Sequence, residues 1–167
     1  MKKKFLIFSG IFITLSLSRF IPHPPNFTTL VALSFYVPVI LGRKYIFYLV
    51  LSFVITDILI GYHNTTQWTW GSVIFIGILS SFFKNEITHR ICGALFSALL
   101  FYLITNFGVW TTGLYAFTAE GLLECFIMAI PFFGYSLIST LFFSVILESI
   151  LLIFKININR FQKILNL

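Results

Sequence analysis

Charged residues are scarce in this chain, and acidic residues are the scarcest. Only 10% of the 167 residues are charged and five are acidic, whereas 59% are hydrophobic and 22 are phenylalanine. Soluble domains carry about 25% charged residues, so this composition excludes an ordinary soluble fold. It predicts an all-α, polytopic membrane protein whose single domain covers residues 1–167.

Cysteine is also rare, and familiar catalytic motifs are missing. Cys92 and Cys125 are isolated thiols without a CxxC pair, which argues against a disulfide framework or a structural zinc site. The chain contains no HExxH, no GxSxG and no glycine-rich phosphate loop, so we expect no catalysis, metal or cofactor. The remaining enzymatic alternative is an intramembrane metal-dependent enzyme, with ligands drawn from His23, His63, Asp57, Glu120 and Glu124.

The net charge of +6 does not indicate a nucleic-acid partner. Lys and Arg residues occur in short clusters between apolar runs, a pattern that orients proteins in membranes. With six crossings, ten of the eleven Lys and Arg residues lie on one side of the membrane and only Arg19 lies on the other. The positive-inside rule therefore predicts six transmembrane helices surrounded by membrane lipid, with both termini cytoplasmic.

Six apolar runs supply the expected transmembrane helices. Residues 111–155 are too long for one crossing, and one alternative makes their first part a seventh span, with the basic tail opposite the other basic turns. The six-crossing prediction instead makes about 118–130 a short helix or re-entrant segment on the outer side. The six expected spans are at about residues 5–18, 28–42, 45–61, 69–83, 91–109 and 131–154.

The stretch SRFIPHPPNF, residues 18–27, interrupts the apolar sequence. Pro22, Pro24 and Pro25 lack backbone N–H groups and bias the residues before them away from helical angles. Because apolar runs flank it, this fixed and non-helical segment is expected at a bilayer surface. Irregular backbone near a membrane packs on protein or lines a wet cavity, so the segment is predicted to be the lid or wall of a pocket.

The first apolar run has two interpretations. A basic start followed by an apolar stretch also fits a secretory signal peptide, with Ser16 and Ser18 near the cleavage site. Because the run leads directly into the proline segment, we interpret it as a permanent helix. Gly10, Thr14 and Ser18 then form a stripe of small residues, which is a candidate docking face for a partner helix or simply a surface for packing within the chain.

The predicted topology gathers the unusual polar residues at the outer end of the bundle. They include donors, acceptors, both charge signs and aromatic rings, as a pocket for a small polar or aromatic ligand requires. Asp57 stands out because an ionisable group inside a span is costly and marks a functional or paired position. The candidate ligand-binding residues are Arg19, His23, Asn26, Asp57, His63, Asn64, Asn106, Trp110, Glu120 and Glu124.

Structural roles are the alternative for each candidate. Arg19 could pair with Asp57 or Glu120, and His23 could be a hydrogen-bonded loop histidine. His63 and Asn64 could merely end a helix, Asn106 could bond a neighbouring helix, and the tryptophans could mark the membrane interface.

The proline motif, with DILIGYH (57–63), TNFGVW (105–110) and EGLLECFIMAIPFF (120–133), resembles an uncharacterised family of small bacterial membrane proteins. That family is similar to the substrate-binding S component of energy-coupling factor (ECF) vitamin importers. The resemblance implies a six-helix bundle that binds a vitamin or related micronutrient near its outer face and works with a transmembrane coupling subunit and two ATPases. S components dock through small residues of their first helix, commonly alanines, and Gly10, Thr14 and Ser18 form a comparable stripe without the alanines.

A membrane scaffold similar to the rod-shape subunit MreD is the competing hypothesis, since it has comparable size and helical layout. A scaffold does not need acidic residues and two histidines gathered under a proline segment. The sequence therefore favours the substrate-binding subunit of an importer.

Overall fold

The computed structural model describes residues 2–166, and across them the chain is all-α, as the composition predicts. The expected domain ends, residues 1 and 167, lie outside the described residues. Two 3₁₀ turns, Arg43–Tyr45 and Ser80–Phe82, join helices. The eight α-helices in this part of the chain are α1 (Lys2–Phe20), α2 (Leu30–Leu41), α3 (Ile46–Ile60), α4 (Thr66–Leu79), α5 (Ile87–Trp110), α6 (Ala119–Met128), α7 (Ile130–Ile153) and α8 (Ile158–Asn166).

Helix α2 is the centre of the bundle. It packs against α3, α4, α5, α7 and α8, and every residue from Leu30 to Pro38 is buried. A helix that is apolar all round is stable only when other elements surround it. Its 12 residues are short for a bilayer crossing, and its neighbours provide the shelter that such a helix needs.

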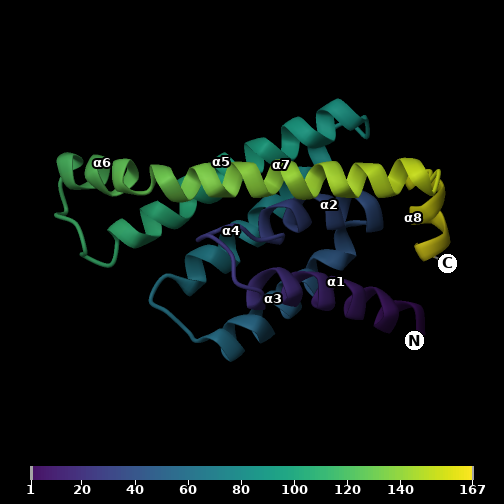
Figure 1. Cartoon of the computed structure of the whole chain (residues 1–167), viewed down its shortest axis with the longest axis horizontal. Helices are drawn as coiled ribbons and strands as arrows, with labels where there is room; N and C mark the ends of the chain where they lie inside the picture. Colours follow the sequence, from purple (N-terminus) through teal and green to yellow (C-terminus); the bar gives the residue numbers. More distant parts are fainter. Residues whose placement is uncertain (1, 167) are drawn as a thin grey trace.

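Helices α5 and α7 form the long axis of the molecule and run side by side (Figure 1). Both have 24 residues and are long and apolar enough to cross a membrane. The core helix of a soluble protein passes the same test, but such a helix is mostly buried. Only 33% of the most apolar window of α5 or α7 is buried inside the protein.

In α7 the polar side chains face inward and the large apolar side chains face outward, which is the opposite of a surface helix in a soluble protein. Its inward face carries small hydroxyl residues such as Ser136, Ser139 and Thr140, all buried. Its outward face carries large apolar residues such as Ile138 and Phe142, which are 60% and 52% exposed. Small residues that let helices approach closely are typical of helix contacts in lipid.

Helix α8 was not among the expected elements, because the basic tail was considered only for its charge. Ile158, Phe161 and Leu165 recur every three or four residues and form an apolar face. Ile158 is buried, and Gln162 Nε2 donates to the Val39 carbonyl at 2.7 Å. This carbonyl belongs to the last turn of α2, where the helix itself provides no donor. Helix α8 therefore closes the end of α2.

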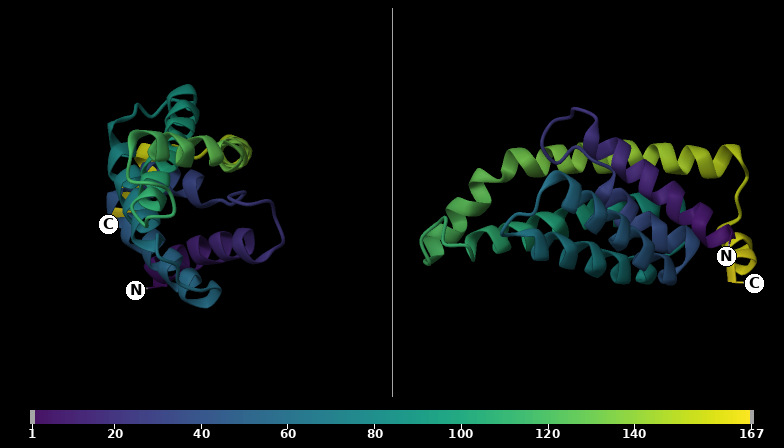
Figure 2. Two further views of the ribbon diagram at one scale, coloured as in Figure 1. Left: turned by 90° about the vertical axis from the view of Figure 1, so that its left-hand side faces the viewer. Right: turned by 90° about the horizontal axis from the view of Figure 1, so that it is seen from below.

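Both chain termini lie at one end of the bundle, and α6 lies at the other (Figures 1 and 2). Two turns between helices meet α8 at the terminal end. Lys44 Nζ donates to the Leu165 carbonyl at 3.2 Å, and Asn85 Nδ2 donates to Asn159 Oδ1 at 3.4 Å. The turns with Lys44 and Lys84 and the basic C-terminal helix therefore share one end of the molecule.

A buried ion pair joins three helices near this end. Arg90 Nε and Nη2 donate to the two carboxylate oxygens of Glu148 at 2.7 and 2.6 Å, and Tyr36 Oη donates to Glu148 Oε1 at 2.9 Å. A bidentate Arg–carboxylate pair is among the strongest side-chain interactions in proteins. It fixes α5 against α7, and Tyr36 joins α2 to the same pair.

Gly93 permits the close contact between α5 and α2. A Cβ added at this position would lie 2.5 Å from Phe35 Cζ and 2.8 Å from Phe83 Cδ1.

Gly93→Ala should therefore destabilise the purified protein by about 1–3 kcal/mol in SDS-induced unfolding, the usual cost of overpacking. Gly134→Ala is the matched control on α7, where nothing lies within 4 Å of an added Cβ, and it should lose no stability. Equal effects of the two substitutions would contradict the packing assignment.

Candidate functional site

The segment between α1 and α2 is non-helical, as the prolines predict. Helix α1 ends at Phe20 and α2 begins at Leu30, and residues 21–26 are exposed. Pro22, Pro24 and Pro25 cannot donate to a helical ladder, so the chain must cross between the helices without one.

Three side-chain hydrogen bonds hold this segment in place. Ser18 Oγ and Thr29 Oγ1 lie 2.8 Å apart, and the Thr29 N–H donates to Ser18 Oγ at 3.2 Å, which fastens the ends together. Ser139 Oγ of α7 donates to the Asn26 carbonyl at 3.4 Å. Asn26 itself has φ 61°, a left-handed conformation that asparagine tolerates better than most residues.

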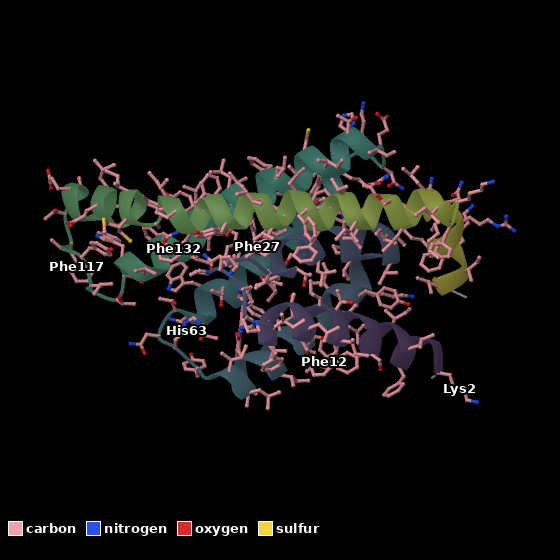
Figure 3. The ribbon with its side chains drawn as sticks, in the orientation of Figure 1. Lys2, Phe12, Phe27, His63, Phe117 and Phe132 are labelled. Atoms are coloured by element: carbon pink, nitrogen blue, oxygen red, sulfur yellow. The ribbon has the colours of Figure 1, made fainter. Side chains whose placement is uncertain are left out.

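A polar hollow lies on one side of the segment and has two adjoining lobes. The first lobe, about 270 Å³, is bordered by the segment, α3 and α4, and the second, about 350 Å³, by α5, α6 and the start of α7. Figure 3 shows His63 on the α3–α4 loop and Phe132 at the start of α7, both lining residues. The residues that line both lobes are Asn26, His63, Thr69, Phe101 and Ser136.

An ion pair lies in the wall of the first lobe. Arg19 Nη2 donates to Asp57 Oδ1 at 2.5 Å, and Arg19 Nη1 donates to the Thr56 hydroxyl. Trp70 Nε1 donates to the second carboxylate oxygen of Asp57 at 2.6 Å. The guanidinium also lies over the Phe53 ring, 4.7 Å from its centroid, in a cation–π contact. Both carboxylate oxygens of Asp57 thus have donors. The ion-pair partner of Arg19 is Asp57 and not Glu120.

Six of the ten predicted ligand-binding residues line the hollow. Arg19, His23 and Asp57 line the first lobe, Asn106 lines the second, and Asn26 and His63 line both. His23 Nδ1 lies 2.7 Å from the Pro24 carbonyl, and Asn106 Nδ2 donates to the Tyr102 carbonyl at 2.8 Å.

The remaining four predicted residues, Asn64, Trp110, Glu120 and Glu124, line neither lobe. Trp110 Nε1 donates to the Ala116 carbonyl at 2.9 Å within its own loop. Glu120 and Glu124 are exposed on α6. Hydrogen bonds from its own backbone N–H and from the Thr118 side chain lower the pKa of Glu120, which keeps its charge in water at the start of the helix.

Sequence reasoning missed several small hydroxyl residues of the hollow. Thr69, Thr105 and Ser136 line it although each lies in an apolar run. The available signal was that polar side chains within such runs face the bundle interior or a cavity. Helix α6 covers the second lobe: Tyr102 Oη donates to the Phe126 carbonyl at 2.6 Å, and Cys125 Sγ donates to the Asn106 carbonyl at 3.3 Å.

The stripe of small residues on α1 is partly free of contacts. Gly10 and Thr14 are exposed, and nothing lies within 4 Å of a Cβ added at Gly10. Ser18 is bonded to Thr29. Thr14 and Ser18 also line an apolar groove of about 610 Å³ between α1 and α7, and His23 lines both this groove and the first lobe.

Residues 2–166 contain no group of three or more His, Cys, Asp or Glu side chains that could hold a metal ion. The two histidines of the hollow bond within their own loops, since His63 Nδ1 lies 3.0 Å from Thr65 Oγ1.

These features define an α-helical protein with two helices capable of crossing a membrane and a polar hollow at one end of the bundle. The chain belongs to a family of unknown function (DUF6580), whose model matches residues 1–161. No curated protein and no solved structure matches the chain.

The Arg19–Asp57 pair should be coupled in a double-mutant cycle. Asp57→Asn and Arg19→Gln should each destabilise the protein by about 3–5 kcal/mol, because each leaves a charge buried without its partner. The double variant should be more stable than the sum of the two losses predicts, by at least about 1 kcal/mol. SDS-induced unfolding measures all four proteins. Glu86→Gln, which removes the exposed partner of His89, is the control and should change stability by less than about 0.5 kcal/mol. Additive losses from Arg19→Gln and Asp57→Asn would refute the coupling.

Proposed function

We propose that the chain is a multi-pass protein of a bacterial inner membrane, with six crossings and both termini in the cytoplasm. The apolar outer face of α7 and its buried hydroxyl residues support a lipid environment. The common location of both termini supports an even number of crossings. The turns with Lys44 and Lys84, together with α8, bring basic residues to that end, as the positive-inside rule requires of a cytoplasmic face.

Cysteine labelling tests this orientation. In a background without Cys92 and Cys125, Thr112→Cys, exposed in the loop after α5, should react with a membrane-impermeant maleimide in intact cells. Asn159→Cys, exposed on α8, should react only after the inner membrane is permeabilised. If both cysteines react in intact cells, α8 lies outside the cytoplasm on the same side as the loop after α5, and the proposed orientation is wrong.

On this basis we propose that the protein is the membrane-embedded substrate-binding subunit of an ECF-type importer for a vitamin or related micronutrient. The observation that carries the proposal is the polar hollow beneath the proline segment, at the end of the bundle away from the basic turns. Its second lobe, about 350 Å³, falls within the range of about 300–1,000 Å³ typical of small-molecule sites, and the first lobe, about 270 Å³, adjoins it. The resemblance to S components supports the same function.

An importer of this kind needs partners that supply energy, namely a transmembrane coupling subunit and ATPases. Gly10 and Thr14 are exposed on α1 and free to contact a partner helix. Small residues allow the close approach that membrane helices use in place of a hydrophobic driving force. A scaffold similar to MreD is the alternative, but it gives no reason for a polar hollow.

Growth on limiting vitamin tests the function. Deleting the gene should raise the amount of one vitamin that an auxotrophic strain requires, and the wild-type gene should restore growth. Asn106→Leu removes an amide from the hollow at nearly constant side-chain volume. It should raise the vitamin concentration that gives half-maximal growth by about tenfold, the effect of one lost hydrogen bond. Asn64→Leu is the same change at an exposed residue outside both lobes and should have no effect.

The membrane abundance of both variants is measured alongside growth. Normal growth of the deletion strain on every vitamin, together with co-purification of cell-wall proteins, would favour the scaffold.

A further inference from the structure

The charges in the wall of the hollow cancel. Apart from the two histidines, Arg19 and Asp57 are the charged side chains among the described residues that line the two lobes. They are bonded to each other at 2.5 Å, and Asp57 is 3% exposed. A ligand carboxylate or phosphate would have to compete with Asp57 for Arg19, and a ligand cation would have to compete with Arg19 for Asp57. Leaving either group unpaired in an apolar surrounding is costly.

Several of the remaining polar groups of the hollow can accept a hydrogen bond from a ligand. Thr69 Oγ1 already donates to the Thr66 carbonyl and Thr105 Oγ1 donates to the Phe101 carbonyl, both within their own helices. A hydroxyl has one donor and two acceptor lone pairs, so each of these retains acceptor capacity only. Asn106 uses one N–H of its Nδ2 for the Tyr102 carbonyl and keeps its amide oxygen and its second N–H.

His23 adds a further acceptor. Its Nδ1 faces the Pro24 carbonyl at 2.7 Å, and because a carbonyl only accepts, Nδ1 carries the proton. In the neutral ring Nε2 is then an acceptor. The aromatic rings of Phe101, Tyr102 and Phe133 complete the walls, and Tyr102 and Phe133 stack on each other with centroids 4.7 Å apart. Such walls suit a ligand with a flat ring.

We propose that the hollow selects an uncharged small molecule that contains a flat ring and donates hydrogen bonds through N–H or O–H groups. This inference rests on the proposed function, because it names the class of nutrient that the importer subunit captures. It separates the protein from carriers of phosphorylated or carboxylated nutrients, whose sites must provide an unpaired cation for the anion.

A competition experiment tests the charge preference. The purified full chain in lipid nanodiscs is incubated with an equimolar mixture of nicotinamide, nicotinate, pyridoxine, pyridoxine 5′-phosphate, riboflavin and riboflavin 5′-phosphate, added to a small-molecule extract of bacterial cells. Native mass spectrometry identifies the compound retained. We expect a neutral compound, with its charged counterpart bound at least about tenfold more weakly. A methylated analogue without the N–H or O–H donors should also bind more weakly than its parent compound.

Retention of an anionic or cationic compound would overturn this inference and leave the proposed function intact. Retention of no compound at all would overturn the proposed function and the inference with it. The two failures are thereby distinguished.

Two variants check that the ion pair sets the preference. Asp57→Asn leaves Arg19 without its counter-ion and should shift selection toward the anionic member of a pair by about tenfold. The double variant Arg19→Gln/Asp57→Asn removes both charges and should keep the wild-type preference for the neutral member. This second variant keeps the test decisive should the single variant fail to fold. A double variant that prefers an anion would contradict the role of charge cancellation.

Discussion

The structure depends on the rule that a charge inside an apolar bundle must be paired with its opposite. The chain buries Arg90 and Glu148 as one pair and largely encloses Arg19 and Asp57 as the other, and each pair joins helices that are distant in sequence. The Arg19–Asp57 pair fixes α1 against α3 beside the hollow, and the Arg90–Glu148 pair fixes α5 against α7 near the chain termini. Since a lone charge in this surrounding would cost several kcal/mol, the two pairs determine which helices lie together at both ends.

Between the two ion pairs, packing is governed by the short, largely apolar α2 and by small hydroxyl residues on α2 and on the helices around it. Ser34 and Ser97 are buried and donate to carbonyls of their own helices, so they add little bulk and leave no unpaired donor. Helices can therefore approach closely around α2. The proline segment cannot join this packing because it has no helical surface, and the polar hollow is found beneath it.

Much of the helical layout could be predicted from the sequence, because apolar runs and proline interruptions are local signals. Each of the six expected spans overlaps one helix, and α6 lies within the expected outer segment at 118–130. Helix α8 was missed because the three residues of its apolar face are separated in the sequence and gain stability only against α2. The choice between Asp57 and Glu120 as partner of Arg19 was also beyond the sequence, since it depends on how α1 crosses α3. For the same reason Glu124 was grouped with the ligand-binding residues although α6 exposes it.

The pairing rule also determines how the proposed site could gain its affinity. Because Arg19 and Asp57 neutralise one another, the hollow offers a ligand little net electrostatic attraction, and long-range steering of an ion is weak. Affinity must then come from short-range contacts, namely stacking on rings such as Phe101 and hydrogen bonds to acceptors such as the Asn106 amide oxygen. Such contacts lose most of their value when a wall is displaced by even one ångström. The bonds that hold the proline segment and α6 in place therefore matter to binding as much as the groups that would touch the ligand.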